Sequence, residues 1–142
     1  MATLFTRIIN GELPARFLWQ DKLCVAFLSI APLRPGHSLV VPRLEVDHWL
    51  DAEPELLSHL TTTAQIIGKA QMAAFHPARI GIVIAGLEVP HLHIHVVPIR
   101  GVHDLDFSHQ DPHPDPDEMD RAAASIRTEL RALGFPEAAG PD

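Results

Sequence analysis

The stretch His91-Leu92-His93-Ile94-His95-Val96-Val97-Pro98 alternates histidine with an aliphatic residue and closes on a proline. Strict alternation predicts a β-strand, because successive side chains of a strand point to opposite faces of the sheet. The three histidines are therefore expected on one face and the aliphatic residues between them on the other. Serine, threonine or lysine would suffice to solvate a polar face, whereas three imidazoles in register indicate chemistry.

The composition fits one globular domain with a sizeable core. The chain has 142 residues, of which 46% are hydrophobic, and this argues against disorder throughout. Eleven basic against eighteen acidic residues give a net charge of −7, which opposes nonspecific binding to nucleic acid and to anionic membranes. We therefore expect no nucleic-acid or membrane partner, and any phosphate-bearing ligand must be held by local groups.

Neither a membrane span nor an export signal is expected. No apolar run approaches the roughly 20 residues that a membrane helix needs, and the N-terminus lacks the basic region, apolar core and cleavage site of a signal peptide. These features predict a cytoplasmic protein. Cys24, the one cysteine, lies in an apolar segment, which favours a small buried side chain over a nucleophile.

β-Strands are expected in five segments: residues 16–20, 24–30, 37–42, 79–85 and 91–98. The first two should pair antiparallel around the turn Asp21-Lys22, and the second is apolar at nearly every position, which indicates an interior strand. The turn Pro35-Gly36 precedes the third strand. The short connection in sequence between the last two expected strands predicts a tight antiparallel hairpin.

Helical spacing of apolar residues predicts three helices. A short one is expected over residues 4–10, and a long one begins near Pro54 and ends near His76, before Pro77. The long helix should bury Leu56, Leu57, Leu60, Ala64, Ile67 and Ala70. Asp115 and Pro116 form the start signal of a terminal helix, whose apolar face comprises Met119, Ala122, Ile126, Leu130 and Leu133.

A polar, proline-rich segment over residues 101–116 precedes that helix. Its histidines, His103, His109 and His113, could bind a metal, but their irregular spacing favours a plain polar loop. Nothing divides the chain into two independent units. We expect one domain over residues 1–107, with residues 108–142 forming an acidic loop and a helix packed on the same domain.

Two kinds of chemistry use histidines at alternate strand positions. For a metal, neighbouring imidazoles lie about 6.6 Å apart along the strand and can converge, whereas the outer two are about 13 Å apart. Further ligands would be needed, and the candidates are His37, His48, Glu45 and Glu88. No ligand spacing typical of a zinc site supports this alternative, so no metal is expected.

The other kind is nucleophilic catalysis, with one imidazole attacking a phosphorus atom while its neighbours bind the phosphate oxygens or the leaving group. An ordinary pKa near 6.5 makes the neutral ring available at neutral pH. His93 has a histidine on either side and is the natural nucleophile. One of its ring nitrogens must be free, so the other should donate its proton to a fixed acceptor such as a backbone carbonyl.

The run from His91 to Val97 matches, at every position, the histidine-triad signature in which three histidines alternate with hydrophobic residues. Residues 7–15, 25–27 and 35–42 extend the likeness. The sequence resembles the Hint-type branch of the histidine triad (HIT) superfamily. That resemblance implies an α+β fold with a five-stranded antiparallel sheet, one long and one C-terminal helix, and a homodimer.

The same resemblance implies hydrolysis or transfer at the α-phosphorus of a purine nucleotide, such as a nucleoside phosphoramidate that releases AMP. The reaction is expected to pass through a covalent nucleotidyl-histidine and to need no cofactor. By motif position His93 is the nucleophile, and His91 and His95 contact the phosphate and the leaving group. His37 is the fourth histidine, at the substrate.

Three places depart from the family pattern. By the resemblance, Thr3, Thr6 and Glu45 occupy positions where many relatives hold a structural zinc together with the first triad histidine, so no such zinc is expected. Ser29 stands where relatives bind the ribose. The phosphate-binding run before the triad reads Gly86-Leu87-Glu88-Val89-Pro90, and Glu88 could repel phosphate, take up a proton, pair with a cation or simply face solvent. These departures leave open a non-catalytic dimer that binds nucleotides or a protein partner.

Overall fold

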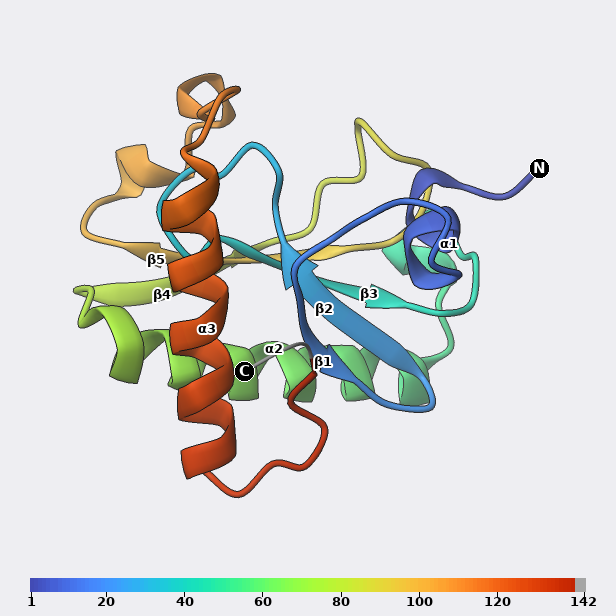
Figure 1. Ribbon diagram of the computed structural model, residues 1–142. Helices are drawn as coiled ribbons and strands as arrows, with labels where there is room; N and C mark the ends of the chain where they lie inside the picture. The colour runs from blue at the N-terminus through green and yellow to red at the C-terminus, as the bar shows by residue number, and fades with distance from the viewer. Residues whose placement is uncertain (140–142) are drawn as a thin grey trace.

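The chain folds around one antiparallel sheet of five strands, in the order β1-β2-β3-β5-β4 (Figure 1). The computed structural model describes residues 1–139. The strands are β1 (Phe17–Gln20), β2 (Cys24–Leu28), β3 (Ser38–Pro42), β4 (Arg79–Val83) and β5 (Ile94–Ile99). This confirms the expected α+β fold with five antiparallel strands, and β2, buried at every residue, is the interior strand that its composition predicts.

Three α-helices flank the sheet: α1 (Leu4–Ile9), α2 (Pro54–Phe75) and α3 (Pro116–Ala132). All three begin near the predicted residues. The Thr3 hydroxyl caps α1, and the Asp115 carboxylate caps α3. α2 ends at Phe75, and its C-cap residue, His76, adopts a left-handed backbone conformation. None of the helices within residues 1–139 is long and apolar enough to cross a membrane.

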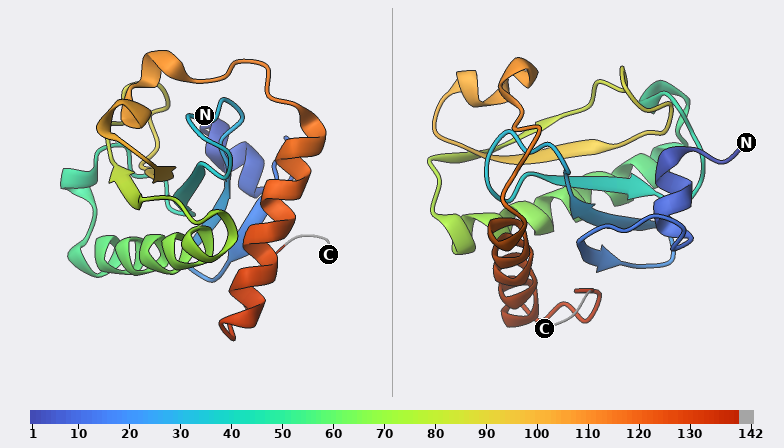
Figure 2. Two further views of the ribbon diagram at one scale, coloured as in Figure 1. Left: turned by 90° about the vertical axis from the view of Figure 1, so that its left-hand side faces the viewer. Right: turned by 45° about the horizontal axis from the view of Figure 1, so that its top comes forward.

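The two faces of the sheet bury separate apolar clusters. α2 and α3 pack on one face, with Ile67 and Ile126 among the fully buried side chains. The smaller cluster on the other face joins α1 to β2 and β3. Figure 2, left, shows α2 below the sheet and α3 at its right, with the segment that follows β5 arching over the top to α3.

The bounds predicted for the histidine strand, residues 91–98, are partly wrong. β5 begins at Ile94, so His91 and His93 lie in the extended segment that leads into it. That segment leaves the ladder with β3, because the N–H of Leu92 donates to the carbonyl of Val46 instead. The expected alternation nevertheless holds. Leu92, Ile94 and Val96 all point into the α2 side of the core.

Two further expectations are also wrong. β4 and β5 pair antiparallel, but residues 84–93 connect them, so the hairpin is not tight. Leu133 is 48% exposed, because α3 ends at Ala132 and the last predicted position of its apolar face lies beyond the packed helix. The other four residues of that face are buried as predicted.

The segment after β5 is ordered into two short 3₁₀ turns, Val102–Leu105 and Phe107–His109. After α3, the chain returns to the outer edge of β1, where Trp19 pairs with Ala138. One edge of the sheet is therefore covered by the C-terminal segment. At the other edge, β4 pairs with β5 alone within the described chain. The end of the predicted unit 108–142, residues 140–142, lies outside the described residues.

Candidate active site

Four histidines that are distant or alternate in sequence meet on the α1 side of the sheet. His37, His91, His93 and His95 are all buried, with at most 8% of each side chain exposed. The ring centroids of His93 and His95 are 4.9 Å apart, and those of His37 and His95 are 5.1 Å apart. The structure therefore brings together all of the histidines that the sequence analysis selected around the motif.

His93 is held with one nitrogen free. Its Nδ1 lies 2.8 Å from the carbonyl oxygen of His91, and because a carbonyl only accepts, Nδ1 carries the proton. Nε2 is then unprotonated and has no hydrogen-bond partner within residues 1–139. Burial lowers the pKa of His93, which keeps the ring neutral. The carbonyl acceptor expected from the sequence is therefore that of His91.

His91 uses both of its ring nitrogens inside the protein. Nε2 donates to the carbonyl of Pro42 at 2.8 Å, so Nδ1 is the acceptor and the Thr3 hydroxyl, 2.6 Å away, donates to it. Burial lowers the pKa of His91 and favours this neutral form. The ring is 0% exposed. It is therefore positioned to orient other groups and is not open to a ligand.

The three residues at the positions of the family's structural zinc gather around the same ring. The hydroxyl oxygens of Thr3 and Thr6 are 3.2 Å apart, and the N–H of Thr3 donates to Glu45 at 2.8 Å. Hydrogen bonds from the Thr6 hydroxyl and from that N–H lower the pKa of Glu45. The cluster is thus a hydrogen-bonded unit built of hydroxyl and carboxylate oxygens, which joins α1 to His91.

His37 and His95 form a second proton-ordered chain. The N–H of Leu33 donates to Nδ1 of His37, so Nε2 of His37 carries the proton and donates to Nδ1 of His95 at 2.9 Å. Nε2 of His95 is then protonated and can donate to a ligand. Burial first, and neighbouring histidines second, lower the pKa values to about 4 for His37 and about 3 for His95. His37 therefore lies behind His95, with both of its ring nitrogens engaged inside the protein.

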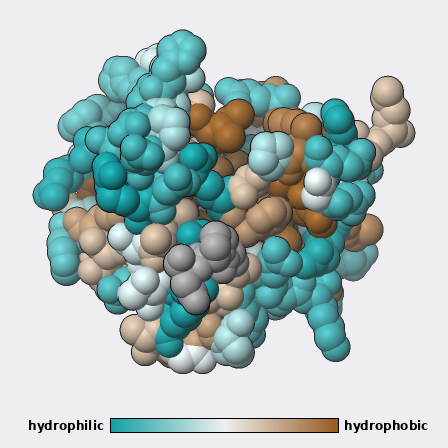
Figure 3. Space-filling model, viewed as in Figure 1, coloured by the Kyte–Doolittle hydropathy of each residue, from teal (hydrophilic) through white to brown (hydrophobic). Residues whose placement is uncertain are grey.

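A cavity of about 220 Å³ opens beside His93 and His95. Since each water takes about 30 Å³, the cavity has room for a small heterocycle. Its apolar wall is formed by Leu4, Phe5, Ile8, Pro14, Ala15, Phe27, Leu28, Ile30, Ala31, Leu39 and Val89. The ring of Phe5 also meets His93 edge to face at 4.9 Å. Figure 3 shows apolar surface gathered near α1 in this region of the molecule.

Of the four predicted substrate residues, Ser29 and Glu88 line this cavity, whereas Gly86 and His37 do not. Ser29 is buried at its wall, and its hydroxyl accepts the N–H of Ala31. Glu88 reaches the rim, and its charge acts on His93. Gly86 lines a second, smaller cavity, whose lining also contains His48 and His93. Leu87 is 92% exposed.

Sequence reasoning missed two residues that the segment after β5 supplies. The ring of Phe107 packs edge to face on His95 at 4.9 Å, and Gln110 lines the cavity. Neither has a periodic pattern around it, so no sequence signal marked them. His103 and His109 of the same segment are mostly exposed.

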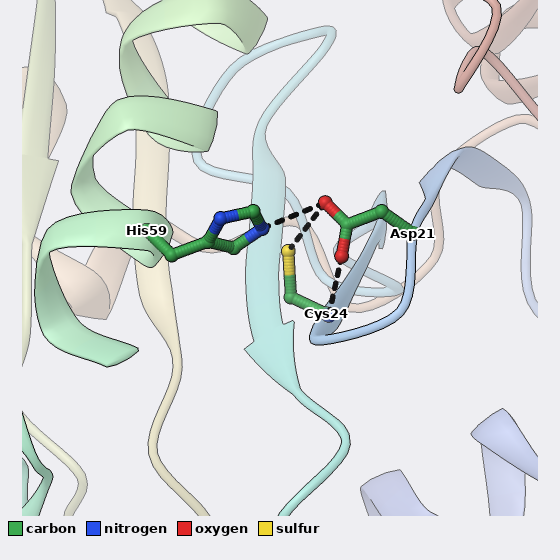
Figure 4. Close-up of side chains that lie close together, drawn as sticks. All are labelled: Asp21, Cys24 and His59. Atoms are coloured by element: carbon green, nitrogen blue, oxygen red, sulfur yellow. Dashed lines mark hydrogen bonds and ion pairs between the residues drawn. The ribbon is translucent and has the colours of Figure 1, made fainter. Parts of the chain in front are cut away.

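The described residues contain one group of three side chains that could share a metal, and it is not the histidine cluster. Asp21, Cys24 and His59 converge at the β1–β2 turn (Figure 4). The Asp21 carboxylate already accepts hydrogen bonds from both other side chains and from Trp19. Burial raises the pKa of the Cys24 thiol to about 12, which favours the protonated thiol that donates to Asp21. These residues fit a hydrogen-bonded clamp better than a metal site.

A sequence model of the HIT domain matches residues 10–102. The adenylylsulfatase HINT3 of Arabidopsis thaliana is 29% identical over 100 residues, 67% of this chain and 51% of that protein. The asymmetrical bis(5′-nucleosyl)-tetraphosphatase of Schizosaccharomyces pombe is 36% identical over 104 residues, 68% of this chain and 54% of that protein. The chain thus spans about half of each of these relatives.

A solved structure extends the likeness to almost the whole chain. A zinc-bound histidine triad family protein from Mycobacterium smegmatis superposes with a TM-score of 0.81 at 29% identity, and the superposition covers 94% of this chain and 96% of that one.

Proposed function

The chain belongs to the HIT family, as its histidine motif predicts, and we propose that it is a hydrolase or nucleotidyl transferase acting at the α-phosphorus of a purine nucleotide. A nucleoside phosphoramidate is the proposed type of substrate. The observation that carries the proposal is the unprotonated Nε2 of His93, beside a cavity with an apolar wall. Two relatives named as an adenylylsulfatase and a nucleosyl-tetraphosphatase support it.

In the proposed reaction, Nε2 of His93 attacks the α-phosphorus. A P–N bond forms while the bond to the leaving group breaks with its electron pair, and the leaving group takes a proton from Nε2–H of His95 or from water. Water or another acceptor then attacks the phosphorus of the nucleotidyl-histidine and releases its proton to His95 or to solvent, and the electron pair of the P–N bond returns to Nε2 of His93. The purine occupies the apolar part of the cavity, which places the phosphate at His93 and His95.

The other histidines act in different ways. His95 donates its Nε2–H to a phosphate oxygen or to the leaving group. His37 fixes the tautomer of His95, and His91 supplies the carbonyl that fixes His93. Their fully engaged rings support positioning roles for both, in place of the direct contacts expected from the motif. Ser29, Glu88 and the Gly86 backbone complete the proposed substrate-binding residues.

We also propose that two copies associate through the open edge of the sheet. β4 has an unpaired edge in the described chain, which invites strand pairing. Ile82 on β4 is 51% exposed and Met72 on α2 is 38% exposed. Both line a shallow hollow between these elements. A two-fold axis there would bury the same apolar surface on both copies.

The test compares hydrolysis of adenosine 5′-phosphoramidate by the wild type, His93→Ala and His103→Ala, with chelator present. His103 is a matched control because its side chain is 76% exposed. We expect the wild type and His103→Ala to turn over, and His93→Ala to lose at least about a thousandfold in kcat. A quench in alkaline denaturant, which preserves a P–N bond, should trap AMP on His93, detectable by mass spectrometry.

Full activity of a folded His93→Ala would end the proposal. Absence of turnover in the wild type, together with calorimetric binding of AMP, would replace it with the non-catalytic nucleotide-binding alternative.

A further inference from the structure

The segment that follows β5 contributes directly to the cavity, although it lies beyond residue 102, where the family match ends. It is fixed at three points. Phe107 packs on His95, the N–H of Asp111 donates to the carbonyl of Pro32 at 3.0 Å, and the side chain of Gln110 donates to the carbonyl of Ala31 at 2.9 Å. Gln110 therefore has a defined position at the cavity wall.

The amide of Gln110 is oriented by that bond. A carbonyl only accepts, so the atom facing Ala31 is Nε2, and Oε1 is directed away from it. Within residues 1–139, Oε1 has no hydrogen-bond partner, and the side chain lines the cavity. The cavity thus has an oriented, unused acceptor on its wall.

The other polar side chains of the cavity indicate which group of a ligand Oε1 of Gln110 could bind. Besides Gln110, the polar side chains around the cavity are Ser29, Glu88, His93 and His95. The two imidazoles are assigned to the phosphate by the proposed function, and the apolar wall suits a base. The part of a nucleotide between base and phosphate is the sugar, whose hydroxyls are donors and need acceptors.

We propose that Oε1 of Gln110 accepts a hydrogen bond from a sugar hydroxyl of the nucleotide, so that the segment after β5 selects ribonucleotides. Ser29 lies on the same wall, and its hydroxyl accepts the N–H of Ala31, whereas Oε1 of Gln110 accepts no hydrogen bond within residues 1–139. This inference rests on the proposed function, since it names the sugar preference of the same site.

The test measures kcat/KM for the 5′-phosphoramidates of adenosine, 2′-deoxyadenosine and 3′-deoxyadenosine. The wild type should prefer the ribonucleotide over at least one deoxy analogue by about tenfold, the amount that one hydrogen bond supplies. Gln110→Met keeps the length but not the acceptor, and it should reduce that preference to about twofold or less. Gln110→Glu loses the donor to Ala31 but keeps acceptor oxygens, and it should retain the preference.

The control is His109→Ala, because His109 is the exposed neighbour of Gln110, does not line this cavity, and has its Nε2 3.8 Å from the Asp106 carboxylate. Its sugar preference should equal that of the wild type. If Gln110 only fixes the position of the segment after β5, Gln110→Met and Gln110→Glu will lose activity on all three substrates alike. An unchanged sugar preference in these variants overturns the inference. A wild type without any turnover would instead contradict the proposed function, so the two failures differ.

Discussion

The Thr3 hydroxyl oxygen lies 2.6 Å from Nδ1 of His91, which connects the cap of α1 to the histidine cluster. Nε2 of His91 donates to the carbonyl of Pro42, and the main-chain carbonyl of His91 accepts a hydrogen bond from Nδ1–H of His93. The Thr3 hydroxyl therefore fixes the tautomer of the His91 ring, and the main chain of the same residue orients His93, the proposed nucleophile. Thr3, which does not line the cavity, is thus connected to the ring of the proposed nucleophile through two hydrogen bonds.

Thr3→Val keeps the side-chain shape and removes the hydroxyl. We expect the free energy of unfolding to fall by about 1–3 kcal/mol, because a buried nitrogen loses its donor and α1 loses its cap. Turnover of the phosphoramidate should fall about tenfold in kcat with KM unchanged. Thr3→Ser retains both hydrogen bonds and should behave like the wild type. A stability loss with an unaltered kcat would show that Thr3 is structural only.

Glu88→Gln tests the electrostatics of His93. Burial lowers the pKa of His93, while the charge of Glu88 raises it. The neutral ring is the proposed nucleophile, so kcat/KM should decline as the pH drops through that pKa, which lies below the ordinary 6.5. Removing the carboxylate removes a group that favours the imidazolium, so the acid limb of the profile should move to lower pH.

The measurement is a pH profile of kcat/KM, with Glu55→Gln as a control for an exposed acid on α2. A profile of Glu88→Gln that moves to higher pH, or that coincides with the control, contradicts this role of Glu88.

Local patterns predicted most of the fold and the members of the histidine cluster. The two-residue period from His91 to Val96 places imidazoles and aliphatic side chains on opposite faces even where the strand ladder has ended, because an extended backbone alternates with or without a partner strand. The start of α3 was equally predictable, since Asp115 and Pro116 act on the first turn alone.

The partners of each ring nitrogen were not predictable, because distant segments supply them. The Pro42 carbonyl is 49 residues from His91, and the Leu33 N–H reaches His37 only after the turn between them has formed. The family resemblance implied that His37 and His91 contact the substrate, whereas both rings are engaged in hydrogen bonds inside the protein. Gln110 was not predictable for a related reason. It lies in a polar segment without periodicity, and only the folded path of the segment after β5 places it at the cavity.

Ile82→Glu tests the proposed association through β4. The change places a charge on the open edge of the sheet, where it would be buried between two copies, so the dimer should dissociate at least about a hundredfold more readily. Sedimentation equilibrium should show the mass of two chains for the wild type and of one chain for the variant. Leu133→Glu is the matched control, because Leu133 is 48% exposed against 51% for Ile82 but lies after α3. Loss of the dimer in Leu133→Glu alone would place the interface elsewhere.

Asp21 stabilises the β1–β2 turn through one carboxylate. One of its oxygens accepts the N–H groups of Leu23 and Cys24, and the other accepts the Trp19 indole and His59, both at 2.8 Å. Burial alone would raise the pKa of Asp21, but these hydrogen bonds outweigh it and hold the pKa at about 2.

Asp21→Asn turns an amide donor toward the Trp19 indole, so we expect the free energy of unfolding to fall by about 1–3 kcal/mol. Asp47→Asn, at an exposed aspartate, should have no such effect. The folded pKa lies below the ordinary 3.8, so the carboxylate contributes its full stability above that pH and loses it as the pH falls toward 2. Urea unfolding should therefore show the same gap between wild type and Asp21→Asn at pH 7 and pH 5, and a smaller gap below pH 3.8. A gap that grows on acidification would mean that the carboxylate does not act as an ionised acceptor.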